Sequence, residues 1–329
     1  MRLGAVILRA FIVLATISVT IRAQSCTNPS VRREWRKLSD GDKQAYHAAN
    51  LCLRSRPKQR YNENFVVTRL DDLTWTHVSL ADQQVIHYVA DFLPWHRMFV
   101  NEHEKMLREE CGYTGPYAYW DWTIDADANA VPNSPIWDSV NGFGGNGVET
   151  GRSDPGFEKC VDGPYSNATL SVGAPPFSRD GTNMPHCLLR EWNNGHRDSN
   201  GEWNVGSMSP SSYNSQAVAR ASSQTNYAAF LDELERRPHD AVIGGDMREF
   251  FAVNDPIFLL HHANVDRIWA RWQGSDPARL NEYSGFNDIR STQRASIDDL
   301  MPMLNLLDQR PRVRDYMNTR AGSLCYVYE

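Results

Sequence analysis

Two segments of the chain place histidines near the start of an expected helix, and these residues have the types and spacing that suit metal chemistry. One is Phe92–Arg97, which reads FLPWHR, and the other is Asp255–Gln273, which reads DPIFLLHHANVDRIWARWQ. Apolar residues in the second segment recur at a spacing that keeps one helix face buried, and His261 and His262 fall within it. Imidazole nitrogens suit copper, zinc, iron or nickel, whereas a buried imidazole without a partner is costly. The segment therefore predicts either metal ligands or core histidines with satisfied hydrogen bonds.

The first segment belongs to a longer stretch, Asp71–Met106, in which successive elements supply three histidines. His77 lies in a run with helical spacing, His87 precedes a short loop, and His96 opens a predicted helix over 95–110. Three imidazoles from a helix, a loop and a second helix can converge on one ion and leave a coordination position open.

The second segment begins with residues that favour a helix start. Asp255 offers a side-chain acceptor to the first turn, and Pro256 loses nothing there by lacking an N–H group. Neighbouring residues on a helix point about 100° apart, so we expect only one of His261 and His262 to face any single point.

The rest of the chain is predicted to support these elements. Residues 30–53 read as two short helices broken at 38–41, and His47 is expected to be a surface or half-buried residue of the second. From about 125 to 223, Gly, Pro, Asn and Ser dominate, which predicts irregular loops around the site entrance. Three further histidines are expected not to bind metal: His103, His186 and His196.

Features at the amino terminus and across the chain indicate export. Residues 1–23 combine an apolar run with arginines and no acidic residue, which is typical of a signal peptide cleaved near Ala23. No later stretch has the roughly 18 apolar residues of a membrane span. The six cysteines predict up to three disulfides, with the pairing left open among about fifteen connectivities, and Asn167 begins the one glycosylation sequon. We therefore expect a secreted protein.

The charge of the chain excludes two classes of partner. The formal net charge is −6, and loss of residues 1–23 would remove three arginines and lower it to about −9. An acidic chain without basic clusters is not expected to bind nucleic acid or an anionic membrane.

The two histidine segments resemble the copper-binding signatures of tyrosinases and catechol oxidases, the type 3 copper proteins, in their small secreted fungal form. Matching pieces run from about Cys26 to the end of the chain and include Tyr119–Trp122, which reads YWDW, and Cys325–Tyr328, which resembles the family's tyrosine motif. The resemblance implies a mainly α fold whose dicopper core is a four-helix bundle with long irregular loops, spanning residues 24–329. It also implies copper-dependent oxidation of phenols or catechols to o-quinones with O2.

The resemblance assigns roles to individual residues. His77, His87 and His96 match the three ligands of the first copper, while His239 and His262 match the first and third ligands of the second. His261 matches a position that is not a ligand in the family. Glu235 matches a glutamate that holds a water near the second copper, so it is expected to accept the proton of a phenol through water. Asp266 is expected to pair with an arginine.

The chain departs from the family pattern after His239. Relatives present two ligands as His-x-x-x-His on one helix face, but this chain has Ile243 four residues after His239, and Gly244 follows at once. The second ligand of the second copper is missing. Asp240, Asp246 and His261 are the available substitutes, and the carboxylates match Cu(I) poorly. The sequence thus predicts weak occupancy of the second site and low phenol oxidase activity.

Three other functions fit parts of the sequence. A secreted tyrosinase-like protein without catalysis, deficient in copper at the second site, follows from Ile243. A dioxygen carrier of the hemocyanin kind would use the same ligands. A zinc hydrolase would use three histidines, but the chain has no H-E-x-x-H motif. The sequence decides neither between monophenol hydroxylation and diphenol oxidation nor the oligomeric state.

Overall fold

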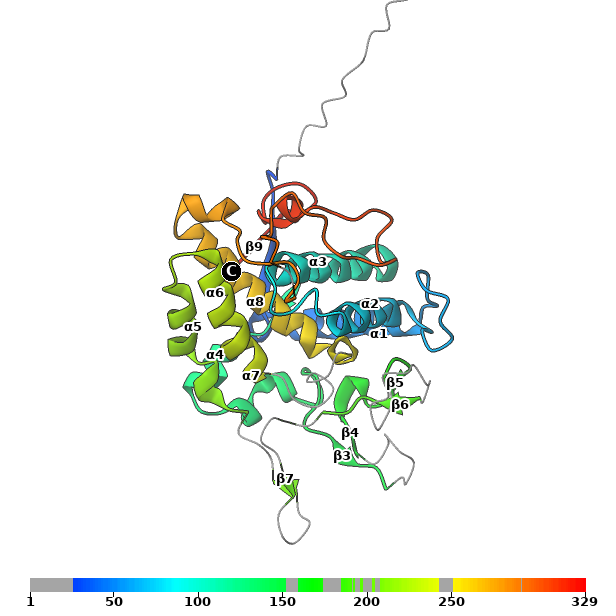
Figure 1. Cartoon of the computed structure of the whole chain (residues 1–329). Helices are drawn as coiled ribbons and strands as arrows, with labels where there is room; N and C mark the ends of the chain where they lie inside the picture. The colour runs from blue at the N-terminus through cyan, green and yellow to red at the C-terminus, as the bar shows by residue number, and fades with distance from the viewer. Residues whose placement is uncertain are drawn as a thin grey trace, which may run out of the picture.

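A computed structural model gives the protein a helical core covered on two sides by irregular chain (Figure 1). It describes residues 26–151, 159–173, 185–190, 192, 196–197, 203–204, 208–242, 251–290 and 292–329. The predicted signal peptide, Ile243, Gly244 and Asp246 lie outside the described residues. The mainly α fold with a four-helix core is confirmed.

Four helices form the centre of this core. They are α2 (Arg69–Asp82), α3 (Phe92–Cys111), α6 (Tyr227–Leu234) and α8 (Ile257–Gly274). Helix α3 packs against α8 and against α1 (Asp40–Ser55), which also contacts α2. Helix α6 meets α8 through aromatic side chains: Tyr227 packs edge-on against Trp269, and Phe230 stacks on Trp272 with ring centroids 4.7 Å apart.

Local sequence explains where these helices begin and end. Thr68 and Asp71 form a capping box before α2, and Ser39 accepts a hydrogen bond from the Asp42 N–H at the start of α1. Asp255 accepts a hydrogen bond from the Ile257 N–H, as its predicted helix-start role requires. Gly112 ends α3 with φ +69°, a left-handed conformation that favours glycine.

The predicted first helix of residues 30–53 is wrong. The segment forms strand β1 (Ser30–Glu34) and a short 3-10 turn, and only the second helix, α1, is present. Strand β1 lies between β2 (Ala118–Tyr119) and β9 (Tyr326–Tyr328), and both pairings are parallel. These partners come from distant parts of the chain, so tertiary pairing overrides the local helical pattern.

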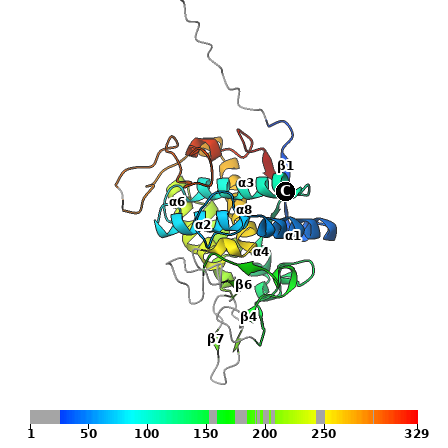
Figure 2. The same ribbon diagram turned by 90° about the vertical axis from the view of Figure 1, so that its right-hand side faces the viewer.

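Irregular chain covers the core on opposite sides. The segment from 125 to 223 contributes mostly short elements on one side, and the segment after α8 covers the other (Figures 1 and 2). The first of these segments contains two-residue strands that pair in three antiparallel hairpins, β3 with β4, β5 with β6 and β7 with β8. Helix α4 (Trp122–Asp127) leads into this segment. The segment then contains β3 (Val148–Glu149), β4 (Lys159–Cys160), β5 (Thr169–Leu170), β6 (His186–Cys187), β7 (His196–Arg197), β8 (Trp203–Asn204) and α5 (Ser215–Ser222).

Three disulfides fasten these parts together. Cys52–Cys111 joins α1 to the end of α3, Cys160–Cys187 staples the irregular segment, and Cys26–Cys325 ties the two ends of the described chain. The predicted number is reached, and the pairing that the sequence left open is now fixed. None of the helices in the described ranges is long and apolar enough to cross a membrane.

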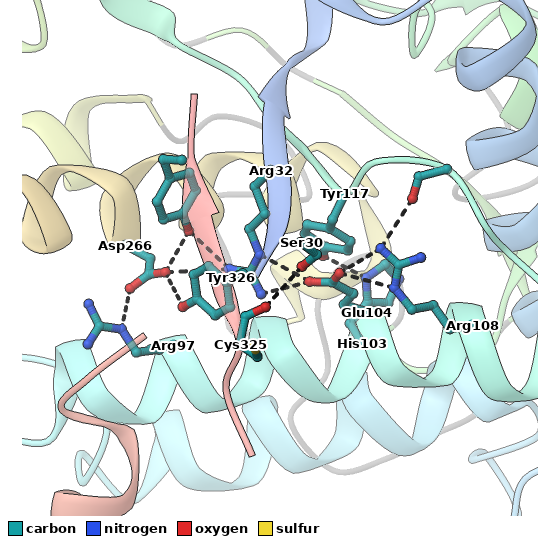
Figure 3. Close-up of polar contacts among 12 residues, drawn as sticks. Ser30, Arg32, Arg97, His103, Glu104, Arg108, Tyr117, Asp266, Cys325 and Tyr326 are labelled. Atoms are coloured by element: carbon teal, nitrogen blue, oxygen red, sulfur yellow. Dashed lines mark hydrogen bonds and ion pairs between the residues drawn. The ribbon is translucent and has the colours of Figure 1, made fainter. Parts of the chain in front are cut away.

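A buried network of charges and tyrosines joins the carboxy terminus to the core. Asp266 on α8 lies between Arg97 of α3 and Arg32 of β1, as Figure 3 shows. The hydroxyls of Tyr326 and Tyr328 both donate to Asp266, and the Arg32 guanidinium lies 3.5 Å from the centre of the Tyr326 ring. The expected pairing of Asp266 with an arginine is confirmed.

Candidate metal centre

The first group of histidines gathers three rings from α2, α3 and the loop between them. His77 lies in α2, His96 lies in the first turns of α3, and His87 lies in the connecting loop. The ring centroids are 5.2 Å apart for His77 and His87, 5.0 Å for His87 and His96, and 5.7 Å for His77 and His96. One nitrogen of each ring lies within 4.8 Å of the others, so the three can hold one ion.

The second group combines His239 with both histidines of α8. His239 ends a π-helical turn, Glu235–His239, which continues α6 and leads into the short helix α7 (Asp240–Val242). Its ring centroid lies 5.1 Å from that of His261 and 5.0 Å from that of His262. One nitrogen of each of these rings also lies within 4.8 Å of the others. Both α8 histidines therefore lie within reach of His239, although only one of them was expected to face any single point.

The two groups face one another across the helical core. The rings of His96 and His262 stack with centroids 4.1 Å apart and planes inclined by 8°. Phe258 lies beneath both groups, with its ring centroid 4.3 Å from that of His262 and 5.0 Å from that of His77. Phe92 packs against His239 at 4.8 Å. Aromatic rings thus surround the histidines and keep the region between the groups apolar.

The hydrogen bonds of two rings direct a lone pair toward the centre. His96 donates from Nδ1 to the Phe92 carbonyl at 2.8 Å, and His239 shares its Nδ1 proton with the Asp240 carboxylate at 3.0 Å. In a neutral imidazole the other nitrogen, Nε2, then bears the lone pair that a metal needs. The Nε2 atom of His96 is buried and has no hydrogen-bond partner.

The donor set fits a pair of copper ions. Burial lowers the pKa values of His87, His96, His261 and His262 well below the ordinary value, which keeps these rings in the neutral, ligating form. The Nε2 atoms of His239 and His262 are 3.3 Å apart. Two nitrogens bound to one ion at about 2.0–2.1 Å stand at about this separation when the angle at the metal is near tetrahedral. Uncharged imidazoles with an apolar surround match the preference of copper for nitrogen ligands.

Glu235 lies beside the centre in the turn that carries His239. Its carboxylate is buried and accepts a hydrogen bond from the Tyr88 N–H at 2.7 Å. Burial raises the pKa of Glu235 well above its ordinary value. Tyr88 follows His87 directly and has φ +57°, a conformation rare for a bulky residue, so the loop that presents His87 is locally constrained by this contact.

The remaining histidines with described side chains lie outside both groups. His103 is buried, and its two ring nitrogens contact the Tyr117 hydroxyl and the Asn50 side-chain oxygen. His47 is buried and contacts the Tyr165 hydroxyl, so the expectation of a surface or half-buried ring is wrong; the aromatic cluster with Trp35 and Phe143 encloses it. His186 is buried in β6, and only the backbone of His196 is described.

His261 is the member of the second histidine group that sequence reasoning did not expect there. The resemblance made its position a non-ligand one, and the helical geometry excluded two neighbours from one point. The sequence signal for His261 was indirect. The chain lacks the family's second histidine of the second copper site, and it has His261 directly beside His262, which matches the third.

Comparisons with known proteins agree with this geometry. The model of the common central domain of tyrosinase matches residues 67–275. The tyrosinase-like protein phomQ1 of Diaporthe leptostromiformis is 40% identical over 93% of this chain and 79% of its own length. Tyrosinase ustQ of Aspergillus flavus is 36% identical over 96% of this chain and 84% of its own length. A polyphenol oxidase from Thermothelomyces thermophila, solved as a point variant, is 28% identical with a TM-score of 0.75, and the match covers 92% of this chain and 89% of that one.

The fold and the matched family model define a protein of the type 3 copper oxidoreductase class. The chain belongs to the tyrosinase family.

Proposed function

We propose that this chain oxidises phenols or catechols to o-quinones with dioxygen at a dicopper centre. His77, His87 and His96 would hold the first copper, and His239 and His262 would hold the second. The observation that carries the proposal is the pair of largely buried imidazole groups facing one another, with the rings of His96 and His262 stacked at 4.1 Å. When bound, the copper pair supplies the electron exchange with dioxygen.

The side chains around the metals would hold the ligands in place and take the proton of the substrate. Phe92 and Phe258 are buried against His239 and His262 and fix the positions of these rings. Glu235 would take the phenol proton through a water molecule, and the Tyr88 N–H fixes its carboxylate. Because burial raises the pKa of Glu235, this carboxylate is a stronger base than an exposed glutamate.

The Glu235→Gln variant tests the catalytic part of the proposal. It keeps the shape of the side chain and removes the base, so we expect phenol oxidation to fall about 100- to 10,000-fold while copper content stays at the wild-type level. Oxygen uptake with a monophenol and with a catechol measures the rate for each substrate. Wild-type protein that carries two coppers and consumes no oxygen with either substrate would contradict the proposed function.

A second candidate function is that of a non-catalytic tyrosinase-like protein. It is suggested by Ile243, which stands where relatives have a ligand of the second copper. A tyrosinase-like protein with one copper and no oxidase activity would follow if the second site stayed empty. Copper content distinguishes the two proposals, at two ions against one per chain.

The proposal extends to the location and the domain organisation of the chain. We propose that residues 1–23 are a cleaved signal peptide, that residues 24–329 form one copper-binding domain, and that the protein is secreted. Three disulfides and the exposed Asn167 in its sequon support an oxidising, extracellular setting.

A further inference from the structure

The second histidine group has one more member than the sequence pattern provides. His239 lies opposite both His261 and His262, at nearly equal ring distances of 5.1 and 5.0 Å. The planes of the two α8 rings are inclined by 76°, so the rings diverge from their helix and still reach the same partner. Because His239 lies across from both of them, the 100° turn between neighbouring helical residues does not exclude either ring.

The Nε2 atom of His261 is buried and lacks a hydrogen-bond partner. The side chain has no exposed surface, and a polar atom buried without a partner costs free energy. Coordination to a metal held by His239 and His262 would give this nitrogen a partner. His261 is the one histidine of the two groups that the family pattern assigns to a non-ligand position, since the other five match ligands.

We propose that His261 supplies the third imidazole of the second metal site, in place of the histidine missing at Ile243. The inference rests on the proposed dicopper centre and concerns which residues complete it. A third neutral nitrogen suits copper better than the carboxylates of Asp240 or Asp246 would.

Trp122 opposes this role of His261. The Trp122 indole N–H donates to Nδ1 of His261 at 3.2 Å. A neutral imidazole that accepts at Nδ1 carries its proton on Nε2, which is the reverse of the arrangement at His96 and His239. To bind a metal through Nε2 as a neutral imidazole, His261 must carry its proton on Nδ1 instead, and a protonated Nδ1 can no longer accept the indole hydrogen bond. The second site is therefore weakened by Trp122.

Two variants of the full chain test the inference by acting in opposite directions. His261→Gln removes the imidazole, and Trp122→Phe removes the indole N–H and part of the ring system while keeping an aromatic ring. Metal-free protein is titrated with Zn²⁺, which binds imidazoles and has no redox chemistry, and then with copper; bound metal is counted by mass spectrometry. His47→Gln is the matched control, since His47 is also buried with an unpartnered Nε2 and lies outside both groups. Thermal unfolding of the metal-free variants checks that each is folded.

We expect H261Q to bind the second metal equivalent at least about 100-fold more weakly than wild type, since loss of a residue that only supports a ligand already costs about 10- to 100-fold. W122F should bind it more tightly, and H47Q should match wild type. Equal second-site affinity in wild type and H261Q would overturn the role of His261. Equal or weaker affinity in W122F would overturn the role of Trp122. Loss of the second metal in H261Q, together with no oxidase activity in wild type, would leave this inference standing and reject the proposed function.

Discussion

Replacing Asp266 with asparagine should cost more stability than any other single change to a charged residue discussed above. Asp266 is buried on α8, and its carboxylate contacts Arg97, Arg32 and the hydroxyls of Tyr326 and Tyr328. Burial by itself would raise the pKa of Asp266, but the two arginines and the tyrosine hydroxyls hold it below its ordinary value. The protein therefore depends on the charged form of this carboxylate.

The expected loss follows from what the variant leaves behind. Asparagine keeps the size of the side chain but removes the charge, so two guanidinium groups with fully buried side chains lose their shared anion. Breaking one side of a buried ion pair costs about 3–5 kcal/mol. For a chain of this size the midpoint of thermal unfolding should fall by about 5–8 °C.

Thermal or urea unfolding of the metal-free protein measures this loss, with Asp232→Asn as the control. Asp232 pairs with Arg236 one turn along the chain, and both side chains are more than half exposed. An exposed pair of this kind contributes about 0.3–0.5 kcal/mol. A loss below about 1 kcal/mol in D266N, against the 3–5 kcal/mol expected for a broken buried pair, would refute the view that this network fastens β1, β9, α3 and α8 together.

Three further predictions concern the centre, pH and the disulfides. His96→Ala should abolish copper binding at the first site, as counted by mass spectrometry; full copper and full activity in this variant would reject the assignment. Burial lowers the pKa of His103 to about 3 in the folded protein. Below about pH 6.5 the unfolded chain therefore binds a proton at this residue that the folded protein does not bind. This group should therefore lower the free energy of unfolding by about 2 kcal/mol between about pH 7 and 5. In His103→Gln the free energy of unfolding should depend less steeply on pH over this range. The same pH dependence in the variant and in wild type would contradict this prediction. Replacing Cys52 and Cys111 by serine should lower stability by roughly 4 kcal/mol, because the bridge joins residues 59 positions apart; an unchanged urea midpoint would count against this.

Helices around the site could be predicted because their signals are local. The spacing of apolar residues around His96 and His262, with Asp255 before one helix and Gly112 after the other, is set within a few turns of chain. The site histidines on these helices were found in the same way. His87 was located by the family resemblance, since a loop residue has no periodicity to reveal it.

Features that depend on distant partners could not be predicted. Strand β1 forms because it pairs in parallel with β2 and β9, which come from distant parts of the chain. The place of His261 depends on where the turn ending at His239 lies opposite α8, and helical geometry of α8 alone says nothing about it. The pairing of the cysteines also needed the folded arrangement.

The number of copper ions bound per chain tests the central claim most directly. Full-length protein is loaded with copper, freed of excess metal and analysed by mass spectrometry for copper and zinc. Two largely buried imidazole groups of three residues each predict two coppers per chain, with no zinc retained when copper competes for the sites. One copper per chain would show that the second group does not form a site, and protein that retains zinc or no metal would contradict the dicopper centre itself.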